Sequence, residues 1–171
     1  MANIFGRKKV SVNEFSEILS SFILKEVKLL IDDAEKLDSI GLNKKSAIES
    51  FINIIIIHTY ATCKAFEWID ISVENRNQIF DGFHDIIVTK LTDSKEEHDE
   101  LYAFMLKLYD AFNDVPDTND SQYLFVLGGK LYRSLSNDEP EANAVLNLNK
   151  LYINFISIVR DAYPKYRIKF E

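Results

Sequence analysis

The sequence predicts an all-α protein, a single-domain bundle of about six helices around a central buried hydrophobic helix at about residues 44–69. Glycine and proline number only 5 and 3 in 171 residues, too few for the frequent turns of a β-sandwich or barrel. Apolar residues recur at steps of three and four along most of the chain, and serine-based helix-start signals precede several of these stretches. A chain of this length normally forms one domain with a sizeable core, so we expect residues 1–171 to form a single helical domain.

The first helix is predicted over residues 12–38. It begins at the segment SVNE (11–14), a capping box in which the Ser11 hydroxyl accepts from the Glu14 backbone N–H and the Glu14 carboxylate reaches back. The apolar residues that follow lie on one stripe of a helix. Gly41 is the residue type that commonly follows a helix end.

The predicted central helix contains the segment FINIIIIHTYATCKAFEWID (51–70). A second capping box, SAIE (46–49), precedes it, and no glycine or proline interrupts it up to residue 69, which is too long for a typical strand. A membrane span needs about 20 mostly apolar residues, but this run is interrupted at Glu49, Asn53, His58 and Lys64. A helix that is apolar on nearly every side belongs at the centre of a bundle.

Three further helices are predicted at residues 74–92, 95–114 and 139–163 from the same periodicity. The helix at 95–114 follows a third capping box, SKEE (94–97). The helix at 139–163 is expected to use Asp138 as its N-cap, with Pro140 in the first turn, where the missing N–H of proline costs nothing.

The segment YLFVLGGKLYRSL (123–135) fits two different structures. Gly128 and Gly129 between apolar runs are a hairpin signal, whereas leucines at helical spacing continue across the pair. We favour a helix with room for a kink. Two glycines inside a helix each cost roughly 1 kcal/mol relative to alanine, so they should have a structural reason, such as the close approach of another helix.

Both ends of the chain are basic. Residues 1–10 form a predicted basic N-terminal arm. In the C-terminal tail, 164–171, cations alternate with apolar residues at a period of two, which predicts an extended segment with a basic edge and an apolar edge; its alternating residues are Lys165, Tyr166, Arg167, Ile168, Lys169 and Phe170. We expect the tail to be ordered and packed on the domain. Packing within a monomer and exchange across a homodimer are both open.

The charge is concentrated in one part of the sequence. The net charge is −7, while residues 67–120 hold 14 acidic and 4 basic residues, a local net charge of 4 − 14 = −10. A chain of this charge is repelled by phosphate backbones and anionic lipid, so we expect neither a nucleic-acid partner nor a membrane partner. The acidic segment is instead suited to a basic protein partner, and its densest run predicts the partner-binding residues Glu96, Glu97, Asp99 and Glu100.

A second group of residues has the chemistry of metal ligands. A short turn near residue 72 should fold the helix at 74–92 back on the central helix, which brings together Cys63, Glu67, Asp81, His84 and Asp85. A di-iron bundle usually shows Glu-x-x-His twice with two further glutamates, whereas DGFH (81–84) supplies one Asp-x-x-His. A structural Cys63, the only cysteine, and a buried, hydrogen-bonded His58 are therefore the favoured interpretation, and we expect no metal and no cofactor.

The leading hypothesis is a non-enzymatic, cytoplasmic interaction protein, such as an immunity-type inhibitor, an adaptor or a regulator. The sequence contains no phosphate-binding glycine loop, no nucleophile elbow, no HExxH and no CxxC. A single cysteine and a start that lacks a secretory signal favour the cytoplasm. The alternative is a metal-binding or small-ligand-binding bundle, which includes an enzyme of unassigned reaction.

Overall fold

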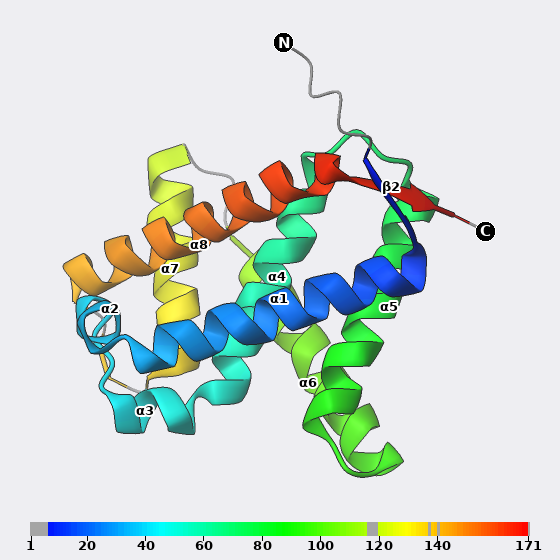
Figure 1. The fold of residues 1–171 in the computed structure, drawn as a ribbon. Coiled ribbons are helices and arrows are strands. Elements are labelled where there is room, and N and C mark those ends of the chain that lie inside the picture. The colour runs from blue at the N-terminus through cyan, green and yellow to red at the C-terminus, as the bar shows by residue number, and fades with distance from the viewer. Residues whose placement is uncertain (1–6, 116–119, 137, 140, 171) are drawn as a thin grey trace.

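A computed structural model describes residues 7–115, 120–136, 138–139 and 141–170 of the chain (Figure 1). The all-α class is confirmed, since the described residues form eight α-helices, one 3₁₀ turn and one pair of short strands. In chain order the elements are β1 (Lys8–Ser11), α1 (Val12–Asp32), α2 (Ala34–Ser39), α3 (Lys44–Glu49), α4 (Phe51–Glu67), α5 (Val73–Leu91), α6 (Lys95–Asn113), α7 (Asp120–Leu135), α8 (Ala142–Ala162), η1 (Tyr163–Lys165) and β2 (Tyr166–Lys169).

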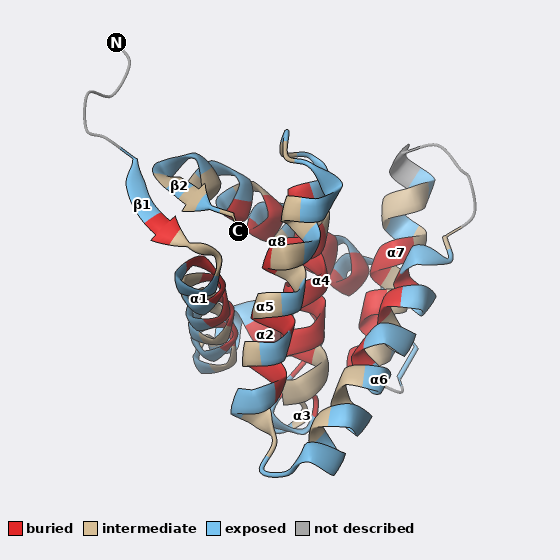
Figure 2. Cartoon of the chain, turned by 90° about the vertical axis from the view of Figure 1, so that its right-hand side faces the viewer, coloured by how far each residue is buried: buried red, intermediate tan, exposed pale blue. Residues whose placement is uncertain are grey.

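Helix α4 is the centre of the bundle, as the sequence predicts. Twelve of its 17 residues are buried, including all of Ile54–Ile57, and it packs against α1, α5, α6, α7 and α8. The burial colouring shows it as the most continuously buried helix (Figure 2). A helix surrounded in this way has no solvent-facing stripe, which accounts for the run of four isoleucines.

The helix predicted over 12–38 is in fact two helices, which corrects the first prediction. Helix α1 ends at Asp32, and Asp33 has extended backbone angles, φ −101° and ψ 93°. The Asp33 carboxylate accepts from the Lys36 backbone N–H and so caps α2. Helix α2 then ends at a Schellman motif in which Gly41 has φ +72°, as expected for a glycine after a helix end.

The helix predicted over 44–69 is also divided, into α3 and α4. The break lies at Ser50, whose hydroxyl donates to the Leu135 carbonyl at 2.5 Å. Asn53 likewise donates to the Ser134 carbonyl at 2.5 Å. The last turn of α7 has carbonyls without intrahelical partners, and the start of α4 satisfies two of them. These two breaks explain why eight helices replace the six expected.

The predicted start signals are confirmed in part. The Ser11–Glu14 capping box is complete. Ser94 caps α6 by accepting from the Glu97 backbone N–H, but the Glu97 carboxylate accepts from the Asp93 N–H, so the second half of that box is not formed. At α3 the prediction is wrong, because Asn43 is the N-cap and Ser46 occupies the third helical position of the box. At α8 it is also wrong, since the helix begins at Ala142 with Glu141 at the N-cap; Pro140 lies outside the described residues.

Residues 123–135 are helical and not a hairpin, because they lie within α7. Gly128 lies where α7 meets α8, and a Cβ atom there would collide with the side-chain amide of Asn149. Asn149 itself donates to the Leu124 carbonyl of α7 at 2.6 Å. One of the two glycines therefore has the predicted reason, close helix approach, whereas a Cβ atom on Gly129 would meet nothing within 4 Å.

The two ends of the chain meet in a parallel two-stranded sheet. Strand β2 begins in the predicted extended tail and pairs with β1, with Val10 opposite Ile168 and Lys9 opposite Arg167. Residues 8–11 are thus a strand, which corrects the prediction of a basic arm over 1–10; residues 1–6 lie outside the described residues. Val10 is buried, and Tyr166, Ile168 and Phe170 pack against the core with their cationic neighbours exposed.

No helix in the described part of the chain combines the length and apolar character needed to cross a membrane.

Deleting residues 164–171 should destabilise the protein. The deletion removes the cover over Val10 and the edge-to-face contact of Tyr166 with Phe15, whose ring centroids lie 5.3 Å apart. We expect the free energy of unfolding to fall by about 2–4 kcal/mol, since three half-buried apolar side chains are lost. Urea unfolding measures this loss. The matched control, Arg167→Ala with Lys169→Ala, should change the value by less than about 0.5 kcal/mol. A dimer that becomes monomeric on deletion would contradict packing within one chain.

The two adjacent glycines of α7 should respond oppositely to alanine. Gly128→Ala places a methyl group against Asn149 and should destabilise the protein by about 1–3 kcal/mol. Gly129→Ala meets open space and should stabilise it by about 0.5–1 kcal/mol through helix propensity. Thermal unfolding of the two variants tests the pair, and equal shifts of the same sign would contradict the close contact of α7 with α8.

Candidate functional site

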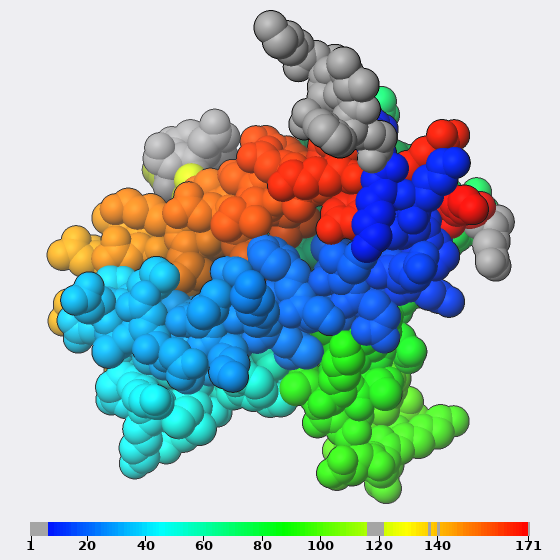
Figure 3. Space-filling model, viewed as in Figure 1, coloured from blue at the N-terminus to red at the C-terminus, as the bar shows by residue number. Residues whose placement is uncertain are grey.

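Helices α5 and α6 form a corner that stands out from the body of the molecule (Figures 1 and 3). The buried residues of α6 all lie in its C-terminal half, namely Met105, Tyr109 and Phe112. None of residues 95–104 is buried. The N-terminal half of α6 is therefore the more exposed half, and it packs on the core through the partly buried Leu101 and Tyr102.

The four predicted partner-binding residues lie on this half of α6, and all are exposed. Glu97 also has a structural role, because its carboxylate accepts from the Asp93 backbone N–H at 2.8 Å. Glu96 and Glu100 form no ion pair with another described residue. These two carboxylates are one helical turn apart and share a face.

Apolar side chains are exposed next to these carboxylates. Phe104 is 41% exposed, and Leu106, which lines the pocket between α5 and α6 that also contains Asp99, is 44% exposed. Phe104 shares a shallow depression with Leu91, Leu101 and the carboxylate-bearing Glu97 and Glu100. The surface therefore combines negative charge with accessible apolar area, a pairing that sequence periodicity alone does not reveal.

His98 is a member of this region that the sequence analysis missed. Its Nε2 lies 3.3 Å from Asp85 Oδ1 on α5, and its Nδ1 lies 3.6 Å from Asp99 Oδ1. The three residues line an open pocket between α5 and α6 with Asp81 and Tyr102. The sequence does show that His98 is adjacent to Asp99. The contact of His98 with Asp85 could not be predicted, because it depends on how α6 folds back on α5.

Beneath this corner, three buried polar groups form one cluster. His84 Nε2 lies 3.6 Å from Cys63 Sγ and 3.1 Å from the Tyr109 hydroxyl. Burial raises the pKa of the Cys63 thiol and of the Tyr109 hydroxyl, and it lowers the pKa of His84 from 6.5 to about 4. All three groups are thus neutral at pH 7 and satisfy one another. A protonated thiol is a poor nucleophile, so the cluster favours a structural role.

The residues with metal-ligand chemistry that were expected to be neighbours are brought together only in part. Cys63 and His84 are brought together, and they line a pocket of about 260 Å³ with Glu67 and Asp81. However, the Glu67 carboxylate lies 3.0 Å from Lys64 Nζ, and both Asp81 and Asp85 are exposed. Among the described residues, no three His, Cys, Asp or Glu side chains converge in a way that could hold a metal ion.

No protein-family model, curated protein or solved structure matches the chain.

The buried histidines should make the protein sensitive to acid. Burial lowers the pKa of both His58 and His84 from 6.5 to about 4. The unfolded chain then binds more protons than the folded chain between pH 6.5 and 4, so the free energy of unfolding falls as the pH decreases through this range. Each histidine should contribute a loss of up to about 3 kcal/mol.

Urea unfolding at pH 4 to 7 measures this slope, and the variant His84→Asn should reduce it. Nuclear magnetic resonance titration assigns the effect to residues. Signals of His58 and His84 that titrate near pH 6.5 would contradict it.

Proposed function

We propose that this chain is a protein-interaction module that binds a basic, partly apolar partner through the N-terminal half of α6. The observation that carries the proposal is that three features occur together on one projecting helix. None of residues 95–104 is buried, the carboxylates of Glu96 and Glu100 lie on this segment, and the side chain of Phe104 is exposed. Roles of this kind include inhibition of a basic toxin, bridging between proteins and regulation.

Charge and apolar area would contribute differently to such a complex. Rim carboxylates raise the association rate of a basic partner and make the affinity salt-dependent. A central aromatic side chain that enters a pocket of the partner typically supplies most of the binding energy. Phe104 is the only aromatic residue exposed above 40% on the described part of α6, so it is the expected anchor.

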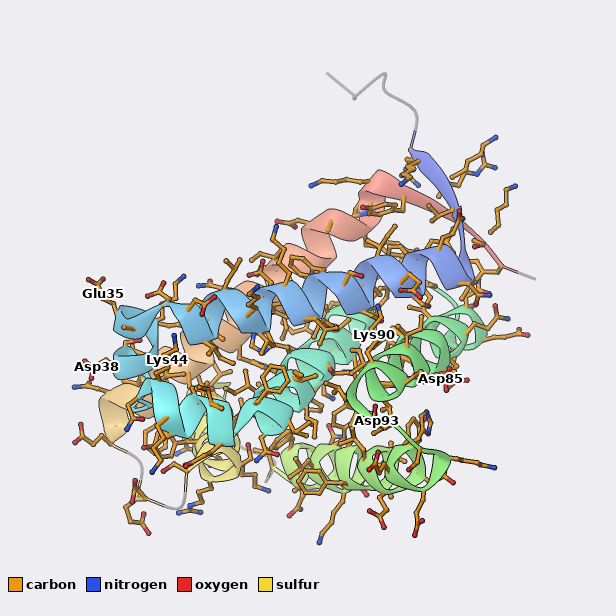
Figure 4. The ribbon with its side chains drawn as sticks, turned by 60° about the horizontal axis from the view of Figure 1, so that its bottom comes forward. Glu35, Asp38, Lys44, Asp85, Lys90 and Asp93 are labelled. Atoms are coloured by element: carbon orange, nitrogen blue, oxygen red, sulfur yellow. The ribbon has the colours of Figure 1, made fainter. Side chains whose placement is uncertain are left out.

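Glu35 and Asp38 on α2 provide a matched control for the charges on α6. They are exposed acidic residues at the far end of the molecule from the α5–α6 corner, where Asp85 and Asp93 lie (Figure 4). The two residues of each pair lie within one helical turn of each other. Each pair consists of two acidic residues, so reversing the charge of either pair changes the net charge of the protein by the same amount.

The partner is first captured by photocrosslinking from position 104 in a lysate of the native host. Position 125 on α7 serves as the control, because Phe125 is 50% exposed and lies on another helix. A protein crosslinked from position 104 and not from position 125 is then purified for binding measurements.

The variant Glu96→Lys with Glu100→Lys should weaken binding of that protein about tenfold or more at low salt. Glu97 is left unchanged because it caps the turn before α6. The control Glu35→Lys with Asp38→Lys should leave the affinity within about twofold, and Phe104→Ala should weaken binding without changing the salt dependence. Calorimetric titration at two salt concentrations measures all three. Equal loss of affinity in the α2 and α6 charge variants would contradict a specific α6 surface.

A further inference from the structure

A second candidate site lies away from the α5–α6 corner, in a groove between α1 and α8. The two helices run across the same face of the molecule (Figures 1 and 3), and they approach each other through the stacked rings of Phe22 and Phe155, whose centroids are 5.4 Å apart. Beyond this contact a groove of about 380 Å³ opens, closed at its end by α2 and floored by His58 of α4. This volume is within the range of small-molecule sites.

The walls of the groove are partly apolar, and Ser39, Asn147 and Asn154 add uncharged polar groups to the lining. Leu30 and Phe155 are buried, and Leu29 and Ile158 stand at the mouth with 49% and 47% of their surface exposed. Isolated exposed apolar residues need no explanation, but these two line the same groove from opposite helices. A ligand with an apolar body would cover both.

The floor of the groove offers one acceptor, on the ring of His58. His58 is only 4% exposed, and its Nδ1 lies 2.8 Å from the Ile54 carbonyl oxygen. A carbonyl can only accept, so Nδ1 carries the proton and Nε2 of the neutral ring is an acceptor. No hydrogen bond to Nε2 comes from any residue in the described part of the chain. Among the described residues, the fully buried side-chain atoms without a hydrogen-bond partner are Ser16 Oγ and Asn149 Oδ1. His58 Nε2 is not one of them, so this nitrogen keeps accessible surface, and His58 lines the groove.

The rim of the groove has no dominant charge. The Lys36 ammonium lies 2.9 Å from Asp33, and Glu26 and Lys150 contribute opposite charges. Anionic and cationic ligands therefore gain little from the rim relative to an uncharged one.

We propose that this groove binds a small, uncharged, mainly apolar molecule with one hydrogen-bond donor, such as a phenol or an indole, whose donor is accepted by His58 Nε2. The apolar part of the lining supplies the burial, and the acceptor at the floor sets the orientation of the ring. A site with a buried acceptor discriminates against an analogue that lacks the donor, because the acceptor is then left without a partner. The inference is independent of the α6 surface.

Indole and 1-methylindole are the probes, since they differ in the N–H donor and in one methyl group. Indole should bind at least tenfold more tightly to the intact protein. Amide shifts in a nuclear magnetic resonance titration should be confined to the lining segments of α1, α2, α4 and α8. Equal affinity for the two probes, no binding of indole, or shifts centred on α5 and α6 would each overturn the proposal.

Variants locate the ligand and test the role of the acceptor. Ile158→Trp should obstruct the mouth and weaken indole binding about tenfold, whereas the control Leu146→Trp, at a 48% exposed position on the same helix outside the groove, should not. His58→Phe should bring the affinity for indole down to that for 1-methylindole. If His58→Phe does not fold, the probe pair and the Ile158→Trp variant still decide the question, and unchanged binding in Ile158→Trp would overturn the site.

Discussion

The burial of α4 on all sides is the constraint on which the rest of the structure depends. A helix that exposes no stripe to water needs neighbours in every direction, and α1, α5, α6, α7 and α8 supply them. This arrangement explains why the chain requires so many helices for its length. It also explains why the short helices α2 and α3 are useful, because they turn the chain at the end of α1 and deliver it to the start of α4.

Full burial creates a difficulty for the polar residues of α4, which the helix resolves mainly within itself. Thr59 and Thr62 donate to carbonyls four residues earlier, at 2.7 and 2.9 Å, and His58 does the same through Nδ1. These local bonds satisfy the donors at little cost to the packing. Other polar groups of α4 reach beyond the helix. Asn53 donates to the Ser134 carbonyl and Tyr60 donates to Asn113. Cys63 lies beside His84, and the His58 ring lines the groove between α1 and α8.

The molecule therefore presents two surfaces of different chemistry. The outer face of the α5–α6 corner is exposed and acidic, which suits recognition of a large, oppositely charged surface. The groove between α1 and α8 has a mixed lining with an apolar part and is floored by His58, which suits a small ligand. They are carried by different helices, so changes to one surface need not disturb the other.

The fold class and the central helix were determined by the sequence, because hydrophobic periodicity and the scarcity of glycine and proline are local properties of the chain. The same local rules identified α5, α6 and α7 and the capping box at Ser11. They also located the acidic run on α6, since exposure of charged residues on one helical face follows from their spacing.

The tertiary structure decided the features that depend on distant contacts. The break at Ser50 is tied to the end of α7 through the Leu135 carbonyl, and Gly128 is set by Asn149 of α8. The pairing of β1 with β2 joins residues about 160 positions apart. The partners of Cys63, the contact of His98 with Asp85 and the groove above His58 likewise arise only when helices pack, because periodicity fixes which face a residue occupies but not which helix lies opposite that face.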